Sequence, residues 1–267
     1  MKKLTLLQEA IEAIPDGSIV GLGGNTLNRA PMAAVFELAR QNKHCLSLVK
    51  TAGAMDIDLL CLAQCVASVD AGFVSYETEF SLAQHYRKSV EKGLVKANEH
   101  ACYTVICALR AAAYGAPFLP VTGLREGDLL RVNPCFRRIT DPFSGDPVTL
   151  VRAIRPDWSI LHVHKADPDG NGAIFGPQYE DVLLSRASQK VLLTTEELVD
   201  RDYFRQGESK ADIPGFLVSA VVHLPKGASP CGCHGHYPPD KETISSFLRL
   251  KDRAQLMEWL KGGPGGE

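Results

Sequence analysis

The segment from Gly21 to Pro31 carries residues suited to holding an anion. It reads Gly-Leu-Gly-Gly-Asn-Thr-Leu-Asn-Arg-Ala-Pro and follows a short apolar run. Glycines between a strand and a helix let backbone N–H groups approach an anion closely. The segment lacks the Gly-Lys-Ser/Thr of a P-loop and the third glycine of a dinucleotide fingerprint. Two interpretations stay open from this pattern: an anion-binding loop, or a tight turn without a ligand.

A second cluster of potential ligands lies near the C-terminus. Cys231, Cys233, His234 and His236 place four soft or borderline donors within six residues, as zinc sites do. Structural zinc sites usually combine two separated ligand pairs, however, and no second pair lies nearby in the sequence. We therefore expect no metal site, and keep a stand-alone metal-binding protein that uses these four residues as the alternative from another functional class.

Two further groups combine titratable side chains with a defined place in the chain. Glu99 precedes a helix expected from Ala101, where a carboxylate suits the helix dipole. It is also a weak catalytic candidate. His162 and His164 alternate along an apolar strand and so face the same side of it. We expect these two histidines to be hydrogen-bonded core residues.

Short apolar strands alternate with amphipathic helices along most of the chain, a pattern typical of an α/β protein. We therefore predict an open, mostly parallel sheet with helices on both faces. The predicted strands are Ser18–Gly24, Leu46–Val49, Ala67–Ala71, Val95–Ala97, Phe118–Val121 (closing the first half), Trp158–His164, Lys190–Thr194 and Val218–Leu224. The predicted helices are Leu4–Ile14, Met32–Gln41, Ile57–Ala63, Ser81–Lys92, Ala101–Ala113, Glu180–Ala187, Lys241–Leu248 and Arg253–Leu260.

One polar stretch interrupts this alternation. Residues 125–147 are rich in Pro, Gly and Arg, and we interpret them as an ordered loop or small hairpin rather than a linker between domains. The chain is accordingly predicted to form a single domain over residues 1–261. The glycine-rich residues 262–267 are predicted to be a disordered tail.

Composition excludes several classes of function. The 267 residues include 29 Lys and Arg against 31 Asp and Glu, for a net charge of −2, so no basic face for nucleic acid is expected. No apolar run approaches the ~20 residues that a membrane-spanning helix requires. Five of the eight cysteines lie in apolar or helix-like segments, where free cysteine behaves as a buried hydrophobe. A reduced, cytoplasmic compartment is therefore expected.

Several stretches, taken in order, resemble the alpha subunit of the family I CoA-transferases, in the glutaconate CoA-transferase branch. The resemblance extends from about residue 5 to about residue 250. It rests on Asp16–Gly24 with Arg29–Met32, Leu109–Pro120, His162–Asn171, Thr194–Glu197, and the region from the Pro-Gly-Phe at 214–216 to Cys231–Tyr237.

This resemblance implies a chain that works with a beta subunit of similar fold in a heterotetramer. In the family, a beta-subunit glutamate attacks the acyl-CoA thioester and then carries CoA as a glutamyl thioester. CoA thus moves between an acyl-CoA and a mono- or dicarboxylic acid, with the CoA thioester as substrate and no further cofactor. The chain lacks a Glu-Asn-Gly or similar glutamate motif, as an alpha subunit should.

The same resemblance assigns the glycine loop to the acyl site at the subunit interface. The residues expected to bind substrate are Gly23, Gly24, Asn25, Thr26 and Arg29. Backbone N–H groups of the loop, with the side chains of Asn25, Thr26 and Arg29, would hold a carboxylate or an oxyanion. Replacing Arg29 by Ala should then weaken the use of dicarboxylic substrates more than that of monocarboxylic ones.

Two related branches carry other chemistry on the same scaffold. One hydrolyses a ring in steroid-derived CoA thioesters with an alpha-subunit glutamate, to which Cys102 aligns, Glu99 lying one helical turn earlier. The other decarboxylates 3-methylglutaconyl-CoA, and this chain is similar to its alpha chain too, at Arg29–Met32, Glu99-His100 and the Pro-Gly-Phe at 214–216. A subunit of a decarboxylase or of a ring-opening hydrolase is therefore the alternative enzyme function.

Overall fold

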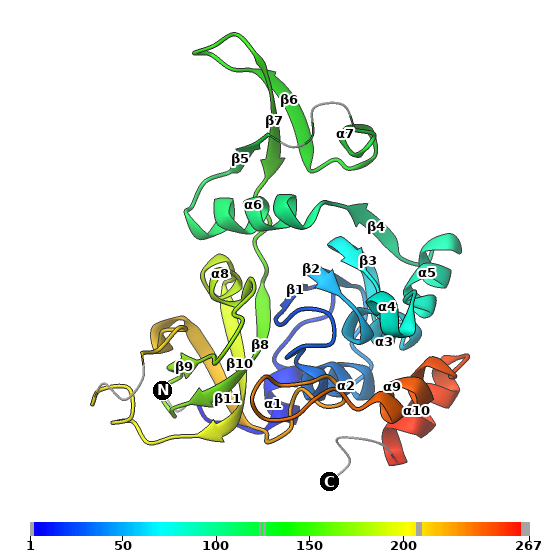
Figure 1. The fold of residues 1–267 in the computed structure, drawn as a ribbon, viewed down its shortest axis with the longest axis vertical. Coiled ribbons are helices and arrows are strands. Elements are labelled where there is room, and N and C mark those ends of the chain that lie inside the picture. The colour runs from blue at the N-terminus through cyan, green and yellow to red at the C-terminus, as the bar shows by residue number, and fades with distance from the viewer. Residues whose placement is uncertain (1–2, 123, 125–126, 207–209, 263–267) are drawn as a thin grey trace.

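The computed structural model describes residues 3–122, 124, 127–206 and 210–262 (Figure 1). Its main sheet contains seven parallel strands in the order β11-β10-β8-β1-β2-β3-β4, and the short β9 pairs antiparallel with β8. The strands are β1 Ile19–Leu22, β2 Leu46–Gly53, β3 Val66–Val74, β4 Lys96–Glu99, β8 Trp158–Ala166, β9 Gly172–Ala173, β10 Lys190–Leu198 and β11 Val218–His223.

Helices cover both faces of this sheet, which confirms the predicted fold class. The helical segments are α1 Leu7–Glu12, α2 Met32–Arg40, α3 Met55–Leu62, α4 Glu77–Phe80, α5 Gln84–Glu91, α6 Cys102–Ala113, α7 Leu129–Val132, α8 Asp181–Ala187, the 3₁₀ turn Gly215–Leu217, α9 Lys241–Leu248 and α10 Arg253–Gly262. One apolar core packs α1, α2, α3, α9 and α10 against the sheet, and a second core includes α6 and α8.

The central strand β8 shows why both faces must be covered. Ile160 belongs to the first core, whereas its neighbour Leu161 and the more distant Val163 belong to the second. Because successive side chains of a strand point to opposite faces, this strand loses apolar contacts on both sides unless helices pack on each. That requirement explains why the strand carries apolar residues on both of its faces.

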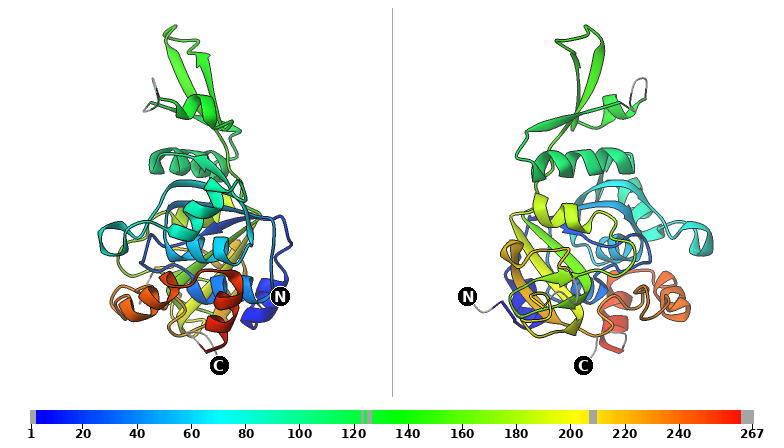
Figure 2. Two further views of the ribbon diagram at one scale, coloured as in Figure 1. Left: turned by 90° about the vertical axis from the view of Figure 1, so that its right-hand side faces the viewer. Right: turned by 60° about the vertical axis from the view of Figure 1, so that its left-hand side comes forward.

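A small antiparallel sheet projects from the body, away from the end that carries both termini (Figures 1 and 2). It contains β5 Phe118–Val121, β6 Phe136–Thr140 and β7 Pro147–Arg152 in the order β5-β7-β6. The small hairpin predicted within residues 125–147 is therefore present as β6, with β7 as its partner. The prediction that residues 118–121 close the first half of the parallel sheet is wrong. Pro120 suits an edge strand, and Phe118 is 46% exposed, unlike a central strand.

The order of the strands creates a crevice between β1 and β8. The chain proceeds from β1 outward to β2, β3 and β4, and then returns to β8 on the other side of β1. Loops that leave the carboxyl ends of these two strands consequently diverge. In open α/β sheets, ligands bind at such a switch point.

Further expectations from the sequence concern the cysteines, membrane-spanning helices and the C-terminal tail. All eight cysteines are free. Within the described ranges, no helix has the length and apolar character needed to cross a membrane. Of the predicted tail, Gly262 is the last residue of α10, and residues 263–267 lie outside the described residues. The single-domain assignment stays a prediction.

Candidate active site

Two segments that the sequence analysis treated separately meet at the carboxyl end of β1. Thr26–Asn28 of the glycine loop and the segment Gly232–Pro239 line one open pocket of about 540 Å³. Reciprocal backbone hydrogen bonds hold the two segments together, since Arg29 N donates to Gly232 O at 2.6 Å and Gly232 N donates to Leu27 O at 2.8 Å. The pocket therefore lies at the switch point of the sheet.

The glycine loop does hold a carboxylate, but it is one from the protein itself. The N–H of Gly24 donates to Asp181 Oδ1 at 2.8 Å, and the guanidinium of Arg29 forms an ion pair with Asp181 Oδ2. Other N–H groups of the loop are also used within the chain: Asn25 N donates to Asn28 O and Thr26 N to Ala52 O. These N–H groups therefore do not form an empty anion site in this structure.

The side chain of Arg29 lies beneath the loop and does not line the pocket. It is 1% exposed, and it also donates to His162 O at 2.8 Å and to Pro177 O at 3.0 Å. Contact between Arg29 and a substrate carboxylate would require displacement of Asp181. The structure thus places Arg29 where it fixes the loop, as a positioning residue.

Asn25 and Thr26 keep side chains that are available to a ligand. Both are partly exposed, and among the described residues neither the Asn25 amide nor the Thr26 hydroxyl has a hydrogen-bond partner. Thr26 lines the pocket with a backbone φ of 44°. A β-branched residue in this left-handed region is strained, and such strain is found preferentially at functional sites.

A buried hydrogen-bond network supports the wall of the pocket that Gly232–Pro239 forms. His162 binds Glu196 Oε1 through Nε2 and Thr194 Oγ1 through Nδ1, both at 2.8 Å. Tyr237, which lines the pocket, donates its hydroxyl proton to the same Glu196 oxygen. Burial alone would raise the pKa of Glu196, but the hydrogen bonds from His162 and Tyr237 outweigh it and lower this pKa to about 2. The ionised carboxylate thus ties the Gly232–Pro239 segment to the sheet.

His164 anchors the same segment from the next position on this face of β8. Its Nε2 binds His234 O at 2.8 Å, and its Nδ1 accepts the N–H of Phe175 at 3.1 Å. Burial lowers its pKa to about 4, so the ring is neutral near pH 7. Both His162 and His164 are therefore hydrogen-bonded core residues, as predicted. Sequence reasoning gave no role to Glu196, although Thr194 and His162 are paired across β10 and β8.

The four donors from Cys231 to His236 do not converge on one point. Among the described residues, two groups of three donor side chains lie close enough for one ion, and this tetrad contributes only Cys233 to them. Cys231 is instead part of the first apolar core. Cys231 faces the core whereas His234 and His236 are exposed, so this arrangement of the tetrad does not support the metal-binding alternative.

Glu99 lies at the end of β4 and is exposed, outside the pocket. It does not cap the following helix, since Thr104 Oγ1 accepts the N–H of the N-cap residue Ala101 at 3.1 Å.

Glu180, to which sequence reasoning gave no role, forms a buried hydrogen bond near the end of β2. There Glu180 accepts the N–H of Thr51 at 3.0 Å, and burial raises the pKa of Glu180.

Comparison with known proteins decides the family. The sequence profile of the coenzyme A transferases matches residues 4–224. This chain belongs to the coenzyme A transferase family. It is 31% identical over 270 residues to the A subunit of glutaconate CoA-transferase from Acidaminococcus fermentans, covering 95% of this chain and 83% of the relative. It is 32% identical over 268 residues to the A subunit of 3-oxoadipate CoA-transferase from Pseudomonas knackmussii, covering 97% and 93%.

The structural comparison extends the similarity to a second activity on this scaffold. The crystal structure of a variant of the decarboxylase AibA/AibB matches with a TM-score of 0.89 and 33% identity, covering 98% of this chain and 100% of that one. An uncharacterized Archaeoglobus fulgidus protein is 37% identical over 238 residues, and the chain spans 53% of its length. This chain thus resembles the A subunits of the two transferases over nearly its whole length.

Proposed function

We propose that this chain is the A subunit of a two-subunit enzyme that moves coenzyme A between an acyl-CoA thioester and a carboxylic acid. The observation that carries the proposal is the pocket at the β1–β8 switch point, formed where the glycine loop meets residues 232–239. Its place on a chain similar to CoA-transferase A subunits along nearly its full length supports acyl binding there.

The nucleophile of the proposed reaction comes from a partner B subunit. The residues lining the pocket include no Asp or Glu, and the carboxylates of Asp181 and Glu196, which bind the glycine loop and Tyr237, are already paired with Arg29 and His162. A partner glutamate attacks the thioester carbonyl, and the C–S bond breaks to give an acyl-glutamyl anhydride and CoA thiolate. The thiolate then attacks the glutamyl carbonyl, releasing the acyl group as a carboxylate and leaving glutamyl-CoA.

In this proposal the A subunit binds and orients the acyl group. The amide of Asn25 and the hydroxyl of Thr26 donate hydrogen bonds to the acyl carboxylate or to the oxyanion that develops during attack. We further propose that the two subunits form a heterotetramer and that the enzyme works in the cytoplasm.

The decisive experiment uses the chain co-purified with its B-subunit partner. The complex is incubated with an acyl-CoA and then analysed by mass spectrometry of the intact subunits. A CoA-sized adduct is expected on the partner, and no adduct on this chain, alone or in the complex. A stable complex that turns over acyl-CoA without any adduct would overturn the transferase proposal.

A decarboxylase subunit is the second candidate, because the AibA/AibB decarboxylase matches with a TM-score of 0.89 over 98% of this chain. A dicarboxylyl-CoA substrate separates the two activities. Decarboxylation releases carbon dioxide and leaves CoA on the product, whereas transfer moves CoA to an added carboxylate without loss of carbon. Release of carbon dioxide without CoA exchange would establish the decarboxylase.

A further inference from the structure

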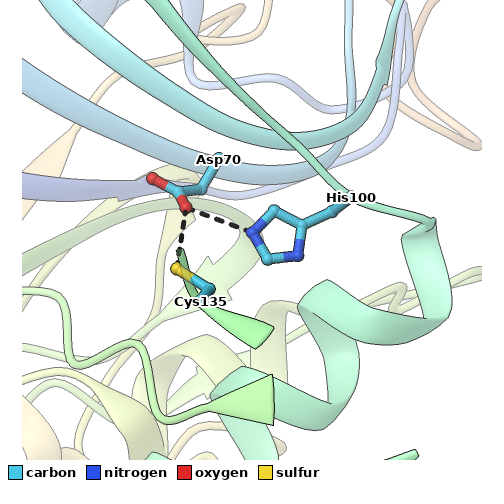
Figure 3. A group of neighbouring side chains, drawn as sticks. All are labelled: Asp70, His100 and Cys135. Atoms are coloured by element: carbon cyan, nitrogen blue, oxygen red, sulfur yellow. Dashed lines mark hydrogen bonds and ion pairs between the residues drawn. The ribbon is translucent and has the colours of Figure 1, made fainter. Parts of the chain in front are cut away.

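A buried group of three potential metal ligands lies away from the pocket, where the small antiparallel sheet joins the body. Asp70 is on β3, His100 directly follows β4, and Cys135 directly precedes β6 (Figure 3). Their exposed fractions are 8%, 5% and 5%. The function proposed above uses none of them, and the residues are too far apart in sequence for any motif to reveal them.

The three donor atoms are spaced much as the ligands of one tetrahedral ion would be. Asp70 Oδ1 lies 3.2 Å from His100 Nε2 and 4.0 Å from Cys135 Sγ. All three donor atoms lie within 4.8 Å of one another. Around a tetrahedral zinc ion, the usual bond lengths place oxygen about 3.4 Å from nitrogen and about 3.6 Å from sulfur. Shifts of a few tenths of an ångström would bring all three donors onto one ion.

Neighbouring side chains already orient the carboxylate and the imidazole. Asn98 Nδ2 donates to Asp70 Oδ2 at 3.0 Å, which leaves Oδ1 directed toward the other two donors. His100 Nδ1 lies 3.1 Å from Thr104 Oγ1, on the side of the ring opposite Nε2. Metal-binding histidines and carboxylates typically have such partners, which fix their orientation.

The hydrogen bonds of Thr104 also favour one tautomer of His100. The Thr104 hydroxyl donates to Ala101 O at 2.9 Å, so its oxygen accepts from His100 Nδ1–H at 3.1 Å. Nε2 then faces the Asp70 carboxylate, 3.2 Å from Oδ1, and can share a proton with it. A metal ion bound here would take the place of that proton.

Cys135 is held in place by the segment that leads into the small sheet. Its N–H donates to Asn133 Oδ1 at 2.8 Å, and Asn133 Nδ2 donates to Glu99 O at 2.8 Å. The guanidinium of Arg152 on β7 lies 3.9 Å from the sulfur, so a thiolate here has a cationic neighbour. The thiol therefore has a fixed position relative to β4.

We propose that Asp70, His100 and Cys135 bind a divalent transition-metal ion, with zinc the best match, that fastens the small sheet to the parallel sheet. One sulfur, one nitrogen and one oxygen ligand suit zinc better than magnesium or calcium, which prefer oxygen alone. A water molecule completes the coordination. Among the described residues, the buried Asn98 Oδ1 lacks a hydrogen-bond partner and offers an acceptor beside the group.

Cobalt(II) is the probe of choice, because it replaces zinc and reports sulfur ligation by an intense near-ultraviolet charge-transfer band. The full chain, purified with its partner and stripped by a chelator, is titrated with Co²⁺. One equivalent per chain and a sulfur-to-cobalt band are expected, and zinc should abolish the band by displacing the cobalt. Absence of the band would overturn the proposal.

Three cysteine variants locate the site. Cys135→Ser should lose the band, whereas Cys45→Ser, at an exposed cysteine, and Cys233→Ser, in the other three-donor group, should keep it. A band that survives Cys135→Ser but disappears in Cys233→Ser would place the ion at His162 and Glu196 and overturn the assignment.

Asn98→Ala keeps the test decisive if Cys135→Ser does not fold, because this variant removes an orienting partner and no ligand. It should weaken Co²⁺ binding about 10- to 100-fold. Unchanged Co²⁺ affinity in a folded Asn98→Ala protein would contradict the proposed site.

Discussion

Arg29 and Asp181 form a fully buried ion pair directly beneath the glycine loop, with side chains 1% and 0% exposed. Asp181 also accepts the N–H of Gly24, so it occupies the place that an anionic ligand takes in other glycine loops. The internal carboxylate fixes the loop before any substrate arrives. Substrate recognition is then left to side chains at the pocket surface.

The first prediction concerns this ion pair. Replacing Arg29 by Met leaves the Asp181 carboxylate buried without a cationic partner and with only the Gly24 N–H to stabilise its charge, which should lower the free energy of unfolding by about 3–5 kcal/mol. Urea denaturation measures the loss. Because Arg29 fixes the loop and does not touch substrate, activity should fall equally for dicarboxylic and monocarboxylic acids.

Arg87→Met is the matched control, since Arg87 pairs with Glu91 on the surface, with side chains 61% and 56% exposed. Its loss should cost less than about 1 kcal/mol. A selective loss of dicarboxylic substrates in Arg29→Met would restore the direct carboxylate contact suggested by the family resemblance and contradict a positioning role.

The second prediction compares two glycines with similar backbone conformations. Gly24 has φ +70° and an added Cβ would lie 2.4 Å from Arg29 O, whereas Gly145 has φ +79° with nothing within 4 Å of its added Cβ. Gly145→Ala should cost only about 1–2 kcal/mol, the usual penalty of left-handed backbone for alanine. Gly24→Ala should cost clearly more and also reduce kcat/KM, because the loop must move. Equal thermal stabilities of the two variants would contradict this prediction.

Much of the fold was predictable from the sequence because its signals are local. The β8 strand and the helices on both faces follow from apolar periodicity within single segments. Residues 118–121 were misplaced because an apolar strand carries no mark of the sheet that it joins. Only Pro120 hinted at an edge position.

Of the candidate site, only the glycine loop was predictable from the sequence. The glycine loop has a recognisable pattern, but the occupation of its anion position by Asp181 depends on a contact across 152 residues. The role of Glu196 likewise depends on strand register, since it needs β10 beside β8 and Tyr237 above them. Such contacts depend on the tertiary structure and cannot be inferred from the spacing of residues in a single sequence.

The third prediction is a pH dependence from His164. Burial lowers its pKa to about 4 in the folded chain, against about 6.5 in the unfolded chain. Between these values the unfolded state binds more protons, so stability falls as the pH is lowered from about 6.5 to 4, by at most about 3 kcal/mol from this residue. His164→Gln should flatten the profile in that window.

Variants must be compared with the parent chain because other groups titrate in the same pH range. Burial also lowers the pKa of His85 to about 4, whereas it raises that of Asp58 to about 7 and thus acts with the opposite sign. An identical slope in His164→Gln and the parent chain between pH 4 and 6.5 would refute the assignment.

The last prediction separates strain from function at Thr26. Its φ of 44° is costly for a β-branched residue and easy for glycine, so Thr26→Gly should leave stability unchanged or raise it by up to about 1 kcal/mol. The same change removes the only side-chain donor of this residue, so kcat/KM should fall about tenfold, the worth of one hydrogen bond. Thr26→Ser keeps the hydroxyl and should retain most of the activity. Steady-state kinetics of the complex with its partner, beside thermal denaturation, measure both effects. If Thr26→Gly and Thr26→Ser are equally active, the hydroxyl does not contact the acyl group and the strain at this position serves only the shape of the loop.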